Sequence, residues 1–170
     1  MTPVVHAADE PGDDMKIIHA LETTRDETLG YFRLGERELA LRYAPEKWSI
    51  RFLLHHLADS ETVLFDRIRR ILSEGRRVLW AFDQDAWANG LDYPHRPLEL
   101  SQRLYGSTRD SVIHFARIHY EQNGHLEFVH SETGVRTLKD ELDKVAWHNE
   151  QHLTQIRTAL GVPDAPESIR

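Results

Sequence analysis

Two histidines four residues apart, His148 and His152, are the strongest indication of chemistry in this sequence. They lie in the stretch WHNEQHLTQI, whose apolar residues recur at helical spacing. Residues four apart on an α-helix differ by about 40° in rotation and about 6 Å in rise, so both imidazoles can bind one ion. Val145 and Ile156 share their stripe, which indicates a face directed into a core, where an unpaired imidazole is costly. The pair therefore predicts a metal site; a chance pair at a wet surface is the alternative.

The ligands of such a site must be nitrogen and oxygen atoms, because the chain has no cysteine. Catalytic zinc-type sites generally use three protein ligands, and the HH pair at 55–56 offers the third. His56 shares a face with Leu53 and Ser60 beside an apolar stripe, whereas His55 lies on a polar stripe with Asp59. We therefore predict His56 as the third ligand and His55 as a solvated residue or one outside the ligand shell.

The residue spacing in this sequence does not match two other metal-binding motifs. A zincin needs glutamate directly after the first histidine; here Asn149 follows His148, and Glu150 is rotated from His148 by about 200°. A ferritin-like di-iron bundle needs Glu-x-x-His on two helices, and the chain has this spacing once, from Glu127 to His130, in a predicted loop. Both classes are excluded, and His130 receives no role.

A hydrolase would also need a proton shuttle near the metal. Asp59 and Glu61 follow His56 by about one helical turn and are the candidates, although the polar stripe favours a place outside the ligand shell. Ser60, on the face of His56, is expected to hydrogen-bond a bound water. His119 is expected to be a buried histidine satisfied by a hydrogen bond.

Helical periodicity and capping signals predict four helices. They cover about residues 14–41, 48–73, 97–122 and 137–160, and an all-α four-helix bundle follows. The connection at 76–96 is expected to contain a helical turn in FDQDAWANG, and the one at 123–136 an extended piece at EFVHSETGV. Trp87, in the first connection, either lines a pocket mouth with its neighbours and Tyr93 or packs against the bundle.

Composition points to one soluble domain of 170 residues, of which 40% are hydrophobic and 29% charged. The net charge of −7 argues against nucleic-acid and anionic-membrane partners. No apolar run approaches the roughly 20 residues of a membrane span, and the N-terminus lacks the pattern of a signal peptide, so we expect a cytoplasmic location. The expected organisation is a flexible segment at 1–13, the bundle at 14–160 and a tail at 161–170.

Four blocks in register carry a family resemblance: WSIRFLLHHLADSE, FDQDAWANG, VHSETGVRTLKDEL and WHNEQHLTQI. Over about residues 14–160 the chain resembles the DinB superfamily, in particular its YfiT-like branch. The resemblance implies up-down-down-up connectivity with 76–96 as the crossover. It also implies a divalent ion, zinc or nickel foremost and iron or manganese as alternatives. The family's ligand positions match His56, His148 and His152.

The resemblance implies two reactions on a small-molecule substrate. The superfamily is labelled as metal-dependent hydrolases, while some members transfer low-molecular-weight thiols such as bacillithiol, mycothiol or glutathione. Either reaction uses the ion to activate a bound water or thiol. Transfer is slightly favoured, because it needs no protein base. The alternative is a non-catalytic metal-binding stress or accessory protein, which predicts a closed coordination shell and no adjoining pocket. A homodimer through an outer helical face is compatible with such a bundle.

Overall fold

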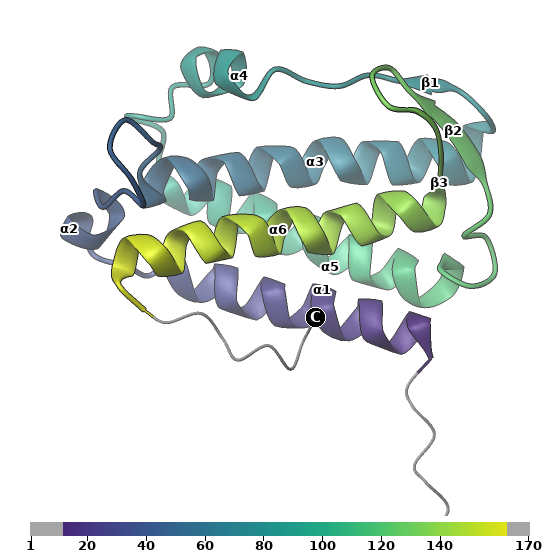
Figure 1. The fold of residues 1–170 in the computed structure, drawn as a ribbon, viewed down its shortest axis with the longest axis horizontal. Helices are drawn as coiled ribbons and strands as arrows, with labels where there is room; N and C mark the ends of the chain where they lie inside the picture. Colours follow the sequence, from purple (N-terminus) through teal and green to yellow (C-terminus); the bar gives the residue numbers. More distant parts are fainter. Residues whose placement is uncertain (1–11, 163–170) are drawn as a thin grey trace, which may run out of the picture.

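The computed structural model describes residues 12–162 and confirms an all-α four-helix bundle (Figure 1). The four long helices are α1 (Asp13–Tyr31), α3 (Ile50–Glu74), α5 (Leu98–His119) and α6 (Leu138–Leu160). Two short helices, α2 (Glu36–Leu39) and α4 (Gln84–Gly90), lie in connections, and three short strands are β1 (Val78–Leu79), β2 (Glu127–His130) and β3 (Gly134–Thr137). The expected N-terminal segment and C-terminal tail lie outside the described residues, except for residues 12, 13, 161 and 162.

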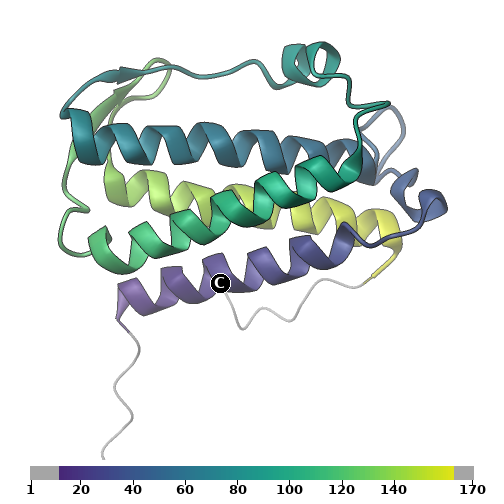
Figure 2. The same cartoon turned by 180° about the vertical axis from the view of Figure 1, so that it is seen from behind.

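The connectivity is up-down-down-up. In Figures 1 and 2, α1 and α6 run in one direction and α3 and α5 in the other. The parallel pair α3 and α5 requires a crossover along the length of the bundle, and residues 75–97 provide it on the outer side of α3 (Figure 1). Both α1 and α3 pack against α5 and α6, which places α1 diagonally across from α3. Within the described part of the chain, no helix is both long and apolar enough to cross a membrane.

The helix ends follow local capping, with one correction. The predicted single helix over residues 14–41 is wrong, because α1 ends at Tyr31 and α2 begins after Gly35. Gly35 is extended, with φ −74° and ψ 163°, and its N–H donates to the carboxylate of Glu38 at 2.9 Å, so a new helix start replaces continuation. The capping box of Thr137 and Asp140 is present at the start of α6.

Both predicted pieces in the connections are present. The helical turn in FDQDAWANG is α4, and EFVHSETGV holds the antiparallel hairpin β2–β3. The sequence pattern did not indicate β1, which pairs parallel to β2 over only two residues, too few for an alternating pattern. This sheet attaches the first half of the crossover to one end of the bundle (Figure 1).

A layer of buried polar side chains divides the core into two apolar clusters. Along α3, Leu57 belongs to one cluster and Leu64 to the other, with Glu61 between them. Along α5, Arg109 lies in the same way between Tyr105 and Val112. We call the following set the central polar layer: Thr24, Thr28, Glu61, Arg109 and Asn149, which the hydroxyl group of Tyr105 joins from the adjoining cluster.

Candidate metal centre

Three imidazoles from two helices come together beside the central polar layer. His56 belongs to α3, and His148 and His152 belong to α6. The Nε2 atom of His148 lies 3.2 Å from Nε2 of His56 and 3.2 Å from Nε2 of His152. Metal–nitrogen bonds of about 2.0–2.1 Å separate neighbouring ligand nitrogens by roughly 2.8–3.4 Å in octahedral or tetrahedral geometry. The spacing of the three side chains therefore fits a single small divalent ion.

All three imidazoles are neutral near pH 7. Burial, with a smaller contribution from the neighbouring His152, lowers the pKa of His56 to about 3. Burial, together with the other two histidines, lowers the pKa of His148 to about 2. Burial also lowers the pKa of His152. Uncharged imidazoles offer the lone pairs that metal coordination requires.

Gln155 fixes the tautomer of one ligand. The Nδ1 atom of His152 lies 2.8 Å from Oε1 of Gln155. An amide oxygen only accepts, so Nδ1 carries the proton and Nε2 has its lone pair directed to the cluster. His56 is oriented differently: its Nδ1 is buried and has no partner among residues 12–162. Its ring is held instead by aromatic contacts.

Aromatic side chains cover one side of the cluster. The ring of Trp48 meets His56 edge-on at 5.2 Å between centroids, and Phe82 stacks on His56 at 6.2 Å. Trp87 of α4 packs on Phe82 at 4.8 Å. His148 and His152 are only partly buried. The cluster is thus shielded on the side of the crossover and accessible beside α6.

Asp59 and Ser60 lie outside the three-histidine cluster. Both carboxylate oxygens of Asp59 accept from Nη1 of Arg96, at 2.9 and 2.8 Å, and one accepts from the hydroxyl of Tyr93 at 2.8 Å. The Ser60 hydroxyl donates to the backbone carbonyl of His56 at 2.7 Å. Asp59 thereby holds the second end of the crossover against α3. Tyr93 is fully buried and does not lie at a pocket mouth.

Of the two alternatives for His55, the solvated residue is wrong, and a place outside the three-histidine cluster agrees with the structure. Its side chain is fully buried, and its Nδ1 lies 2.8 Å from the hydroxyl oxygen of Ser101. The crossover covers this face of α3, because Tyr93 packs on the His55 ring at 5.3 Å. Burial, with a smaller contribution from Arg96, lowers the pKa of His55 to about 4.

Two other histidines have local hydrogen bonds. Nδ1 of His119 lies 3.2 Å from Oδ1 of Asn123, so the expected hydrogen bond is present, but the side chain is half-buried and not buried as expected. Nδ1 of His130 accepts from the backbone N–H groups of Glu132 and Thr133 at 3.3 and 3.4 Å. His130 thus stabilises the turn of the β2–β3 hairpin.

Sequence reasoning missed the residues that join the cluster to the bundle. Asn149, next to His148, accepts from Nη2 of Arg109 at 2.6 Å and from the Tyr105 hydroxyl at 2.5 Å. Its amide nitrogen donates to the Thr28 hydroxyl at 2.9 Å. A signal was available: Arg109 interrupts the apolar stripe of α5, and a charge at such a position is buried only with a partner.

The sequence is similar to a protein family and to several of its members. A family model described as DinB superfamily matches residues 20–156. "Putative metal-dependent hydrolase OB0413" of Oceanobacillus iheyensis is 32% identical over 127 residues, which cover 75% of this chain and 73% of that protein. "Putative metal-dependent hydrolase YfiT" of Bacillus subtilis is 28% identical over 128 residues, 72% of this chain and 70% of that protein.

The fold matches a solved structure as well. The structure of Bacillus subtilis YfiT is described as a "probable metal-dependent hydrolase with an unusual four-helix bundle topology". It aligns with a TM-score of 0.77 over 94% of this chain and 95% of that chain, at 22% identity. At this identity the likeness establishes the shared fold.

Proposed function

Because this chain belongs to the DinB superfamily, we propose that it is a metal-dependent enzyme whose ion is held by His56, His148 and His152. The observation that supports this most directly is that Nε2 of His148 lies at ligand spacing from Nε2 of both His56 and His152, and that the ligand atoms of all three lie within 4.8 Å of one another. Similar proteins that are named as metal-dependent hydrolases support it further. We propose zinc or nickel as the ion, with iron or manganese as alternatives, since imidazole ligands suit all of them.

The protein would supply position and electrostatics. When bound, a divalent ion lowers the pKa of a coordinated water or thiol and supplies a nucleophile near neutral pH. The three neutral imidazoles leave the positive charge of the ion undiminished. Gln155 holds His152 in the ligating tautomer, and Phe82 and Trp48 keep water from one side of His56. His148 and His152 are the more exposed of the three proposed ligands.

Among the two reactions, thiol transfer has the better support. Hydrolysis benefits from a carboxylate that moves a proton at the metal, and within the described chain no carboxylate joins the histidine cluster. Asp59 and Glu61 already accept hydrogen bonds from Arg96 and Arg109. Transfer of a low-molecular-weight thiol of the bacillithiol class needs no such base. We therefore propose thiol S-transfer first and hydrolysis of an ester or amide second.

Metal content tests the site. We expect about one divalent ion per chain in protein purified without a histidine tag, measured by elemental analysis, and loss of the ion in His56→Ala and His152→Ala. Gln155→Leu should retain the site but bind the metal about 10–100-fold more weakly, because it removes the partner that orients a ligand. His119→Ala, outside the cluster, is the matched control. Retention of the ion in both ligand variants would refute the assignment.

Enzyme assays then distinguish thiol transfer from hydrolysis, and both from a non-catalytic protein. The metal-loaded wild type is assayed for thiol transfer and for ester and amide hydrolysis, with His152→Ala as the blank. Activity in one assay that disappears in the variant identifies the reaction. A metal that binds stoichiometrically without any turnover would favour the alternative of a non-catalytic metal-binding stress or accessory protein.

We propose that Asp59 and Ser60 support the site from outside the ligand shell. Asp59→Asn keeps the shape of the side chain but weakens its ion pair with Arg96. We expect lower activity with an unchanged pH dependence of kcat/KM, because the carboxylate anchors the crossover and moves no proton. Loss of an acidic limb from the pH profile would instead make Asp59 the proton shuttle.

Location and assembly stay predictions. Cell fractionation checks the cytoplasmic location. Light scattering coupled to size exclusion checks for a homodimer through an outer helical face.

A further inference from the structure

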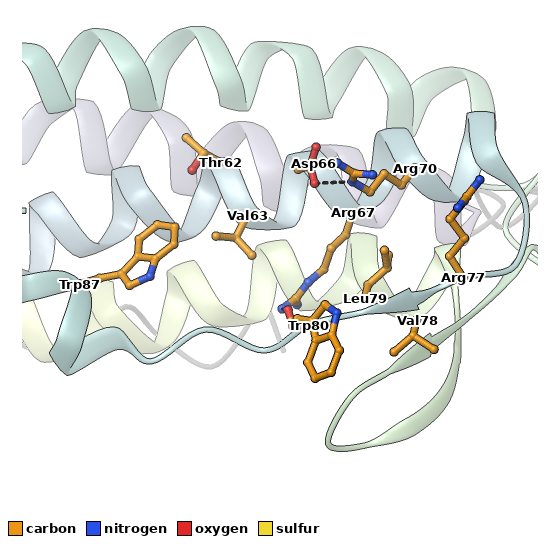
Figure 3. Close-up of a pocket in the computed structure, with 10 residues that line it drawn as sticks. All are labelled: Thr62, Val63, Asp66, Arg67, Arg70, Arg77, Val78, Leu79, Trp80 and Trp87. Carbon is orange, nitrogen blue, oxygen red and sulfur yellow. Dashed lines mark hydrogen bonds and ion pairs between the residues drawn. The ribbon is translucent and has the colours of Figure 1, made fainter. Parts of the chain in front are cut away.

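A groove runs along α3 beneath the crossover, beyond the histidine cluster (Figure 3). Its volume is about 570 Å³, and none of the three proposed metal ligands lines it. Trp87 lies at one end and Arg77 at the other, with Arg67 directed toward Trp80 between them (Figure 3). A cavity of this size accommodates a small organic molecule.

The groove follows the same face of α3 as the proposed metal ligand. Val63 and Arg67 come seven and eleven residues after His56, so each lies within about 20° of it around the helix. Trp87 lines the groove and packs on Phe82, which in turn stacks on His56. The two rings are thus the boundary between groove and cluster. A molecule in the groove has one end beside that boundary and the other end near the arginines. Arg67, the first of these arginines along α3, lies roughly 16 Å from His56 along the helix axis.

The far end of the groove is rich in arginine, in a chain of net charge −7. Arg67, Arg70 and Arg77 line it together with Asp66, and Glu74 and Glu141 pair with these arginines from outside the lining. Arg70 pairs with Asp66 at 2.7 Å, and Arg77 pairs with Glu74 at 3.0 Å. Ion pairs between such exposed side chains contribute little, so an incoming anion can replace them.

Arg67 differs from Arg70 and Arg77 in being buried and held by partners within the protein. It is only 4% exposed and is held by Glu141 at 3.1 Å and by the carbonyl of Trp80 at 2.5 Å. Its Nε is buried without a partner among the residues described. The groove therefore has a buried cation in its wall, whose Nε–H lacks a partner among the residues described, and two exposed cations beside it.

We propose that this groove binds an organic anion, with a carboxylate or phosphate at Arg70 and Arg77 and a planar or apolar body between Trp80 and Trp87. The inference deepens the proposed function, because the anion is assigned as the part of the substrate remote from the reacting atom. The substrate class is then an elongated molecule whose reacting group passes the Phe82–Trp87 pair and whose far end is anionic. Arginine suits such recognition because its planar donors bind carboxylate and phosphate in pairs.

Three ligands with one body and different head groups test the proposal: 4-phenylbutyrate, 3-phenylpropyl phosphate and the neutral 4-phenylbutanamide. Dissociation constants are measured by calorimetry on metal-free protein. We expect at least one anion to bind about tenfold or more tightly than the amide, and the better anion identifies the head group. In Arg70→Gln/Arg77→Gln this preference should disappear while the affinity for the amide stays unchanged. Arg33→Gln/Arg103→Gln removes two exposed arginines outside the groove and should leave the preference intact.

The metal site and the groove are distinguished by repeating the titration with His152→Ala. If this variant still prefers the anion to the amide, the result supports anion binding in the groove, whether or not the protein binds a metal. Equal affinities for acid, phosphate and amide in the wild type would overturn the proposal. So would absence of binding by all three, or a preference that survives in Arg70→Gln/Arg77→Gln.

Discussion

Replacing Arg109 by methionine should destabilise the bundle by about 3–5 kcal/mol. Arg109 is fully buried, and its Nε and Nη2 donate to the two carboxylate oxygens of Glu61 at 2.6 and 2.8 Å. Its Nη1 donates to the Thr24 hydroxyl at 2.8 Å. Methionine fills much of the volume but leaves the Glu61 carboxylate, itself only 2% exposed, without a counter-charge. The variant therefore measures the cost of an uncompensated charge at the centre of the protein.

Urea unfolding checks this expectation, with two comparisons. Arg117→Met removes an exposed arginine that pairs with Glu22, and it should cost less than about 1 kcal/mol. Arg109→Met/Glu61→Leu removes both charges, and it should be more stable than Arg109→Met alone, since an apolar pair avoids the desolvation of either ion. A single variant as stable as the wild type would mean that the central polar layer does not hold the helices together.

Acid should destabilise the metal-free protein strongly, by roughly 6 kcal/mol between pH 7.5 and pH 5. Burial lowers the pKa of His55, His56 and His148 to about 4, 3 and 2 in the folded state. In the unfolded chain each has a pKa near 6.5, so below that pH the unfolded state binds more protons than the folded state. Their stabilising contribution is complete above about pH 6.5 and decreases as the pH falls, by about 2 kcal/mol for each histidine at pH 5.

Urea unfolding of metal-free protein at several pH values measures this effect. A domain whose total stability is at the lower end of the usual range of about 5–15 kcal/mol should unfold near pH 5, and a more stable one should lose a large part of its stability. His56→Gln/His148→Gln should lose less stability on acidification, by about 4 kcal/mol, because two of the three groups no longer titrate. Bound metal should shift the loss to lower pH, since it competes with protons for the ligand nitrogens. If wild type and variant lost the same stability on acidification, His56 and His148 would not be the histidines whose lowered pKa values cause the loss.

Much of the fold was predictable because its signals are local. The capping box of Thr137 and Asp140 and the closing Gly161 define α6 through contacts between residues a few positions apart. The four-residue spacing of His148 and His152 already placed both on one face. Where a local signal was overlooked, as at Gly35 and Glu38, the predicted helix was too long.

Prediction of the three-histidine cluster also required a choice between His55 and His56 on a second helix. Periodicity selected His56 over His55 as the member of an interior face, and His56 is the histidine whose Nε2 approaches His148. The same reasoning failed for His55, because periodicity describes one helix and the crossover that buries His55 lies more than thirty residues further along the chain. A polar stripe on a helix is exposed only if nothing else packs on it.

The sequence by itself determined the four long helices apart from the end of the first, the spacing of the histidine pair and the absence of thiolate ligands, because these depend on neighbouring residues and on composition. Tertiary structure alone decided which charges are paired. Glu61 meets Arg109, Asp59 meets Arg96, and Arg67 meets Glu141 across 37 to 74 positions of sequence. It also formed the groove between α3 and the crossover. Such contacts arise from the way the helices and the crossover pack in space, and the spacing of residues within one segment carries no information about them.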